Sequence, residues 1–164
     1  MDISSLDSGP IWLTLQLASV TVMILLAIGT PMAWWLAHTR SKMRVGMEAI
    51  VALPLVLPPT VLGFYLLILL GPNGWIGSPM KALTGSPLSF TFTGLVFAST
   101  LYSLPFVVQP LQSNFESIGK SPMETAASLG ASKWDAFFSV ILPLSRRGYL
   151  TAIVLGFAHT LGEF

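Results

Sequence analysis

Two pairs of polar side chains stand one helical turn apart in apolar sequence. His159 and Glu163 are four positions apart, so on a helix they lie on one face and can share a proton or a hydrogen bond. Ser99 and Ser103 have the same spacing, and their hydroxyls can either join packed helices or contact a polar ligand. For the serines, helix packing is the favoured interpretation.

A third pattern is a cluster of prolines in an apolar stretch. Pro54, Pro58 and Pro59 lack the amide hydrogen that a helix needs, so we expect a break, with a second helical segment restarting at Thr60. The amide-rich, positive end of that segment would point into the bundle, where it could meet an anion. Measured from Ala49, the break lies about 15 Å along the helix, near the middle of a bilayer. A proline kink packed against a neighbouring helix is the alternative, and both interpretations stay open.

These residue types predict no catalysis, metal site or cofactor. The sequence has no cysteine, and His38 has no Ser and Asp spaced to complete a triad with it. No His or carboxylate cluster has the spacing of metal ligands. The Gly-rich phosphate loop that ends in Lys-Ser or Lys-Thr is also missing from the sequence, so we expect no ATPase site in this chain.

The composition indicates that these residues lie in a membrane. Among the 164 residues, 53% are apolar and 9% are charged, and the mean hydropathy is +0.75, which excludes a water-soluble globule. Eight Lys and Arg nearly balance seven Asp and Glu, so no basic surplus exists for binding nucleic acid.

Apolar runs of spanning length predict the elements that position the polar pairs. A helix of about 20 residues crosses a bilayer. Residues 1–164 are therefore predicted to form one all-α, polytopic transmembrane bundle, with spans at about 11–37, 49–70, 90–111 and 148–164. The last run reaches Phe164 without a helix stop, so we expect the chain to be a fragment. Glu163 lies about 22 Å along this run from Gly148, where its carboxylate is either functional or reaches interfacial water.

Positive charge is concentrated in two of the three loops. Lys81 alone follows the second run, whereas the first and third runs are followed by Arg40, Lys42, Arg44, Lys120, Lys133, Arg146 and Arg147. Because cytoplasmic loops keep positive charge, we expect the first and third loops to be cytoplasmic and the N-terminus to lie outside. Asp2 and Asp7 differ from the cationic start of a secretory signal, so the first run is expected to stay in the membrane. Trp34 and Trp35 fit an aromatic belt at its inner end.

The loop between the third and fourth runs predicts two short helices joined by a tight turn. Ser121 is a suitable N-cap, Pro122 suits the first helical position, and Glu124 would complete a capping box. Gly130 provides a residue that can adopt the left-handed conformation and end this helix.

A second helix is expected to follow the turn. Ser132 and Asp135 can cap its start, and Pro143 should limit it. Its apolar stripe consists of Trp134, Phe137, Phe138 and Ile141. The first helix exposes the small residues Ala126 and Ala127 beside the turn, which permits close approach by another surface. Taken alone, these features also fit an amphipathic segment lying on the membrane.

The order of residues in this loop resembles the cytoplasmic loop of binding-protein-dependent ABC importer permeases. That pattern reads Glu-Ala-Ala, three residues, Gly, nine residues, Ile, one residue, Leu-Pro. The matching residues are Glu124, Ala126, Gly130, Leu142 and Pro143, while Thr125 and Val140 replace an Ala and the Ile. The resemblance implies that residues 112–147 form a coupling loop that docks into a cytoplasmic ATPase subunit, with Ala127 beside its turn.

Three further stretches look like molybdate ABC transporter permeases. They are residues 53–65, residues 71–77 and the end from Leu161 to Phe164. Sulfate permeases share the general arrangement and are the nearest alternative. The likeness covers Leu13 to Phe164, but that family continues through an external loop and at least one further helix, so its C-terminal part is missing here. The family also often carries an Arg near Gln109, which this sequence lacks.

The resemblance implies a permease subunit that forms a homodimer in a bacterial or archaeal inner membrane and moves molybdate or tungstate into the cytoplasm. Its implied partners are a cytoplasmic ABC ATPase and an extracytoplasmic substrate-binding protein. The residues taken as candidates for the path are Pro58, Pro59, Thr60, Ser99, Ser103, His159 and Glu163.

Three other classes of membrane protein are alternatives. An ion-coupled secondary transporter is disfavoured because the three complete runs carry no acidic residue for a coupling ion. An intramembrane enzyme is disfavoured because no nucleophile and base can be paired. A structural subunit without transport activity is the third alternative.

Overall fold

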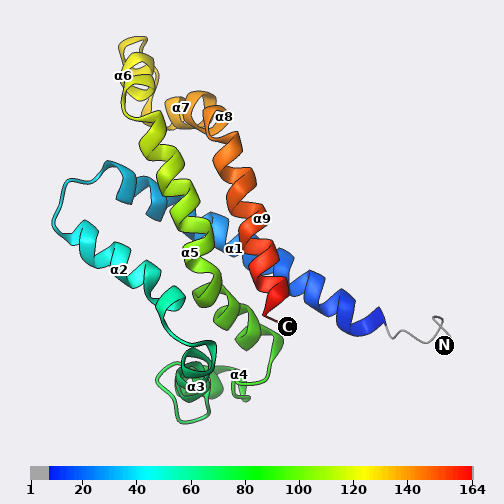
Figure 1. Ribbon diagram of the computed structural model, residues 1–164. Helices are drawn as coiled ribbons and strands as arrows, with labels where there is room; N and C mark the ends of the chain where they lie inside the picture. Colours follow the sequence, from blue (N-terminus) through cyan, green and yellow to red (C-terminus); the bar gives the residue numbers. More distant parts are fainter. Residues whose placement is uncertain (1–7, 164) are drawn as a thin grey trace.

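The computed structural model describes residues 8–163, which form helices joined by short turns (Figure 1). In chain order these are α1 (Ser8–His38), α2 (Met43–Val56), α3 (Pro59–Leu70), α4 (Gly77–Thr84), α5 (Phe92–Ile118), α6 (Ser121–Ser128), α7 (Lys133–Ala136), the π-helical turn η2 (Phe137–Ile141), α8 (Leu142–Leu144) and α9 (Arg146–Gly162). No strand occurs in the described range, so the predicted all-α fold is confirmed.

Two helices and two bent helix pairs are candidates for membrane spans. Helices α1 and α5 are each long and apolar enough to cross a membrane. The bent pairs are α2 with α3, at 109°, and residues 133–144 with α9, at 70°. The run predicted as one span at 49–70 is thus two helices, because Pro58 and Pro59 interrupt the hydrogen-bond ladder.

The core forms where α1, α5 and α9 pack together. Helix α5 is central, since it contacts α1, α9 and α2. The largest fully buried apolar side chains of the core are Leu25, Leu36, Val107, Leu111, Phe115 and Ile141. Trp34 is partly buried and packs edge-on against the core residue Phe115, with ring centroids 5.2 Å apart. Trp35 is exposed, as a belt residue would be.

Small residues let α9 lie close against α5. The buried residues of α9 recur at every fourth position and are Gly148, Ala152, Gly156 and Thr160. A Cβ atom on Gly156 would lie 2.7 Å from Cγ2 of Val107, and one on Gly148 would lie 2.5 Å from Cγ of Asn114. Such a stripe allows two backbones to approach, which is how helices associate where lipid removes the hydrophobic driving force.

Residues 43–70, the α2–α3 arm, contribute Val51 to this core, with Met47 packed against it, and otherwise lie at its edge. Val51 is the buried residue of α2, and Leu70 is the buried residue of α3. Figure 1 shows α2 beside α5, while α3 and α4 lie at the opposite end of the molecule from α6. The arm therefore links the two ends of the molecule outside the main helix bundle.

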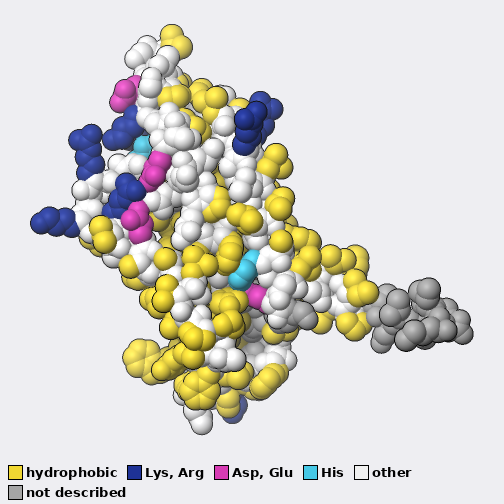
Figure 2. Space-filling view, in the orientation of Figure 1, with side chains coloured by type: hydrophobic (Ala, Val, Ile, Leu, Met, Phe, Trp, Pro, Cys, Tyr) yellow, Lys and Arg dark blue, Asp and Glu magenta, His cyan; other side chains and the backbone are white. Residues whose placement is uncertain are grey.

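Charged side chains are concentrated at one end of the molecule. Figure 2 shows most Lys and Arg at the end that carries α6, α7 and the α1–α2 connection. Lys81 lies on α4, at the other end (Figure 1). The first and third loops therefore lie on the same side of the bundle, as the charge pattern predicts.

Candidate translocation cavity and coupling loop

A cavity of about 520 Å³ lies between α3, α5 and α9. Most of its wall is apolar, from residues such as Leu62, Leu66 and Leu95. The polar and aromatic groups in the wall are Ser99, Tyr102, His159 and Glu163. Three of the four residues of the two candidate pairs therefore line one cavity, while Ser103 is fully buried and does not line it.

Both carboxylate oxygens of Glu163 accept hydrogen bonds from α5. Ser99 Oγ donates to Oε2 at 2.9 Å, and Ser103 Oγ donates to Oε1 at 3.4 Å. Nδ1 of His159 lies 3.3 Å from the same Oε1. The Glu163 side chain is only 12% exposed, so it turns into the bundle. The two serines accordingly join α5 to α9.

His159 is held by ring packing as well as by its hydrogen bonds. Its Nδ1 lies 3.0 Å from Ser103 Oγ. The imidazole stacks on Phe106, with ring centroids 3.8 Å apart, and Tyr102 lies on another side at 4.9 Å. Because the imidazole is packed on several sides, it keeps one orientation, and its Nδ1 stays beside Oε1 of Glu163.

The break at Pro58 is present, but it presents fewer donors than expected. Helix α3 begins at Pro59, which lines the cavity, and Thr60 is exposed outside the cavity lining. The Val61 amide already donates to the Pro58 carbonyl at 3.0 Å, and neither proline has an amide hydrogen. Thr60 therefore carries the first free amide of α3, and the positive end of this helix is poor in donors.

The polar cluster does not have the charge of a simple anion site. A carboxylate, an imidazole and hydroxyls that already donate to that carboxylate offer few donors to an oxyanion. The groups are better suited to holding α5 and α9 in register beside the cavity than to binding an anion tightly.

Thr160, Tyr102 and Phe106 were not predicted from the sequence. Thr160 is fully buried, and its Oγ1 lies 3.0 Å from Ser103 Oγ. It stands three positions before Glu163, on the same helical face, so helical spacing could have identified it. The two aromatic residues have no such signal, because aromatic residues are common throughout this sequence.

The coupling-loop residues form a projection beyond the end of α5 (Figure 1). Glu124, Thr125 and Ala127 are exposed on α6, whereas Ala126 is buried, contrary to the expectation that both alanines are exposed. Leu142 and Pro143 lie apart from α6, on the short helix α8. The loop therefore presents α6 and its turn as the exposed part.

The predicted capping box at the start of α6 is wrong. Helix α6 includes Ser121, its N-cap is Lys120, and no side chain caps it. Pro122 consequently lies at the second helical position, and the Glu124 amide donates to the Lys120 carbonyl at 3.1 Å. The physical reason is that Gly119, with φ of +70°, turns the chain and lets the helix start earlier.

The turn after α6 and the start of α7 agree with the sequence predictions. Gly130 has φ of +86°, and its amide donates to Ala127, while the Ala131 amide donates to Ala126. These are the two hydrogen bonds of a Schellman motif. Ser132 and Asp135 form the expected capping box.

The second helix does not end at Pro143. A π-helical turn, η2, precedes α8, and the chain bends only at Ser145. A proline ring clashes with the carbonyl four residues earlier, here Ser139, and the wider π turn at that position gives it room. The predicted apolar stripe is consequently divided: Phe137 and Ile141 pack in the core, while Trp134 and Phe138 stack on each other outside it.

Comparison with known proteins identifies the family. Residues 29–164 match the family described as "Binding-protein-dependent transport system inner membrane component". The chain belongs to this family. It is therefore the permease component of an ABC transporter, a multi-pass inner-membrane protein whose partners are an ATPase and a binding protein, and ATP hydrolysis is not its own activity.

Several curated relatives carry names that state a substrate. The chain is 59% identical to the molybdenum transport system permease protein ModB of Azotobacter vinelandii, over 100% of this chain and 73% of the relative. It is 37% identical to the ModB protein of Haemophilus influenzae, over 100% of this chain and 69% of the relative. It is also 38% identical to a probable sulfate transport system permease protein of Chlorella vulgaris, over 93% of this chain and 57% of the relative.

Proposed function

We propose that this permease component imports molybdate, with tungstate as a second substrate. The observation that carries the proposal is the 59% identity to a molybdenum permease in an alignment that covers all 164 residues of the chain. Sulfate is the second candidate, because a probable sulfate permease is 38% identical over 93% of the chain. The likeness of residues 53–65 and 71–77 to molybdate permeases also favours molybdate.

The proposed transporter contains two copies of this chain. In the family that the coupling loop resembles, each permease subunit docks on one ATPase subunit, so two coupling loops match two ATPase subunits. The cavity beside α3, α5 and α9 forms part of the path in each copy, together with the break at Pro58 and Pro59.

The cationic end of the molecule faces the cytoplasm, and the N-terminus faces outside. The charge pattern supports this orientation, because cytoplasmic loops keep Lys and Arg. It places α6, with Glu124 and Gly130, where a cytoplasmic ATPase can reach it. A binding protein delivers the anion to the opposite face, and closure of the ATPase subunits moves the coupling loops so that the bundle alternates between two open states.

Uptake by vesicles that contain the permease, its ATPase and its binding protein tests this function. We expect molybdate accumulation that requires ATP and the binding protein and that tungstate inhibits, while a tenfold excess of sulfate leaves it unchanged. Preferential uptake of sulfate would show that the permease is a sulfate importer instead. Uptake driven by an ion gradient without ATP would refute the coupling loop's proposed role.

A further inference from the structure

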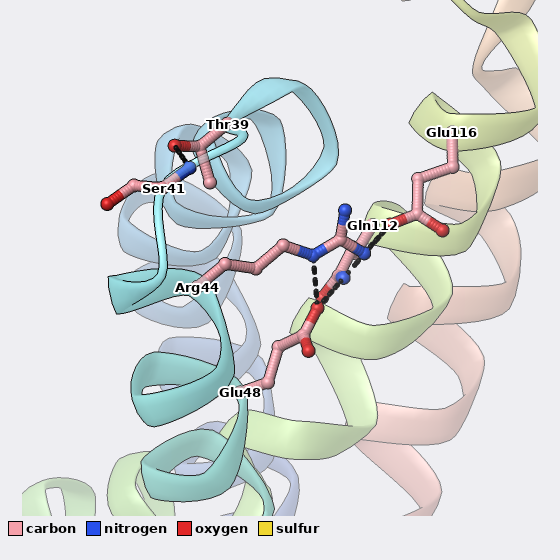
Figure 3. Close-up of polar contacts among 6 residues, drawn as sticks. All are labelled: Thr39, Ser41, Arg44, Glu48, Gln112 and Glu116. Atoms are coloured by element: carbon pink, nitrogen blue, oxygen red, sulfur yellow. Dashed lines mark hydrogen bonds and ion pairs between the residues drawn. The ribbon is translucent and has the colours of Figure 1, made fainter.

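Four polar side chains from α2 and α5 meet (Figure 3). They lie near the end of α5 that leads into α6. Arg44 of α2 donates through Nε to Glu48 on its own helix at 2.8 Å, and through a terminal nitrogen to Glu116 of α5. Gln112 of α5 donates to Glu48 at 2.7 Å and to Glu116 at 3.1 Å. These residues form a closed network, which we call the α2–α5 latch.

The latch is the main polar link between the arm and the bundle. Helix α2 has one buried residue among 14, so apolar packing holds it weakly. The side chains of Arg44, Glu48 and Glu116 are 34%, 35% and 39% exposed. Glu48, Gln112 and Glu116 border a hollow of about 290 Å³. Partly hydrated charges of this kind can exchange partners, whereas deeply buried charges cannot do so without a large desolvation cost.

The position of the latch connects the coupling loop to the cavity. Glu116 lies in the last turn of α5, and α6 begins five positions later at Ser121. Arg44 lies in the first turn of α2, and the far end of α2 is the 109° break. Pro59, directly after that break, lines the cavity that contains Glu163. A displacement of α5 near α6 can therefore reach the cavity through α2.

Arg44 has a partner on each side of the contact, which makes a two-state link possible. When α5 stays close, Arg44 bridges Glu48 and Glu116. When the end of α5 moves away, Glu48 remains four positions from Arg44 on the same helix and keeps the guanidinium paired. Neither state leaves an unpaired arginine, so the exchange avoids the penalty of an isolated charge.

We propose that Arg44, Glu48, Gln112 and Glu116 transmit movement of the coupling loop to the α2–α3 arm and so to the cavity. The proposal rests on the proposed function as an ATP-driven importer. While the latch is closed, α2 follows the end of α5 and turns α3 about Leu57 and Pro58. When it opens, the arm moves independently of α5. These residues are positioning residues, since they act on the cavity through α2 and α3.

Charge exchange across the latch tests this role in the assembled transporter. The variants are Arg44→Glu, Glu116→Arg and the double variant, which again has one arginine and two glutamates. ATP hydrolysis and molybdate uptake are measured in the same vesicles. We expect each single variant to lower the molybdate transported per ATP at least about fivefold while hydrolysis continues, and the double variant to return to within about twofold of wild type.

Two further variants separate the latch from general effects of charge or folding. Lys42→Glu makes the same charge change two positions away, outside the network, and should leave the ratio unchanged. Arg44→Gln removes the charge without reversing it and should also lower the molybdate transported per ATP. It replaces Arg44→Glu in the test if that variant fails to assemble. An unchanged ratio in the single variants, or a double variant no better than they are, would overturn the latch. Failure of the wild-type complex to import molybdate with ATP would instead refute the proposed function.

Discussion

Glu163 shows how a charged residue can be retained within a helix bundle. Its carboxylate is bound on both oxygens by hydroxyls of α5, and His159 lies on the same face of α9. The spacing of His159 and Glu163 and the spacing of Ser99 and Ser103 were both visible in the sequence. Their meeting was not, because Ser99 and Glu163 are 64 positions apart and nothing local in the chain records which helices pack together.

At this scale we predict an energetic coupling between Ser99 and Glu163. Ser99→Ala removes the donor of this contact, and Glu163→Gln removes the charge of its acceptor, so the double variant should cost less than the sum of the singles. We expect a coupling of about 1 kcal/mol in the free energy of unfolding, within the range for hydrogen bonds between membrane helices. Unfolding in mixed detergent micelles measures it.

Ser19→Ala provides the matched control for this cycle. Its hydroxyl bonds to the carbonyl of Leu15 on its own helix, so the change should show no coupling to Glu163→Gln. Zero coupling for Ser99 as well would mean that the hydroxyl–carboxylate contact does not hold α5 to α9.

At the scale of elements, the sequence predicts the turns and caps that depend on local backbone conformation. It does not predict features that depend on packing against distant segments. Gly130 and the Ser132–Asp135 box were predicted because a positive φ and a capping pair are local requirements. The π turn before Pro143 was missed, since two helical geometries can accommodate the same proline. The Arg44–Glu116 contact was missed because its residues are 72 positions apart.

The turn at Gly130 gives a prediction about coupling. A Cβ at this position would meet nothing within 4 Å, so any penalty comes from the backbone alone. Gly130→Val forces a β-branched residue into the left-handed region, at a cost of about 1–2 kcal/mol, and should lower ATPase binding and uptake by about tenfold. Gly130→Asn should stay near wild type, because Asn tolerates this conformation.

Both Gly130 variants should reach the membrane in normal amounts, so protein abundance is measured together with ATPase co-purification. If Val at this position binds the ATPase and supports uptake as well as Asn does, the shape of the turn is irrelevant to docking.

The contact between α5 and α9 gives a prediction about stability. Gly156→Ala would place a methyl group 2.7 Å from Cγ2 of the buried Val107, so the helices must separate. We expect a loss of about 1–3 kcal/mol in the free energy of unfolding. Gly46→Ala on α2 meets nothing within 4 Å and should leave stability unchanged or raise it by up to about 1 kcal/mol. Equal effects of the two changes in detergent unfolding would show that α5 and α9 are not closely packed.

At the scale of the whole molecule, the arrangement of charge and the position of the coupling loop both depend on one orientation of the bundle in the membrane. In the proposed function the end that carries α6 faces the ATPase, and the same end carries most of the Lys and Arg (Figure 2). A bundle inserted the other way would satisfy the apolar spans equally well, but it would present α6 to the wrong compartment. Orientation is therefore the property on which the assignment of the coupling loop depends.

Single-cysteine labelling tests that orientation directly, because residues 1–164 contain no cysteine and an introduced thiol is the only one in this part of the chain. Ser41, Ser78 and Ser128 are all exposed, so replacing each by Cys should leave the thiol accessible. In intact cells a membrane-impermeant maleimide should label position 78, beyond the second predicted span, and should label positions 41 and 128 only after permeabilisation. The permease is expressed without its ATPase, so that docking cannot shield position 128. Labelling of position 128 from outside, with position 78 protected, would reverse the orientation and remove α6 from the reach of a cytoplasmic partner.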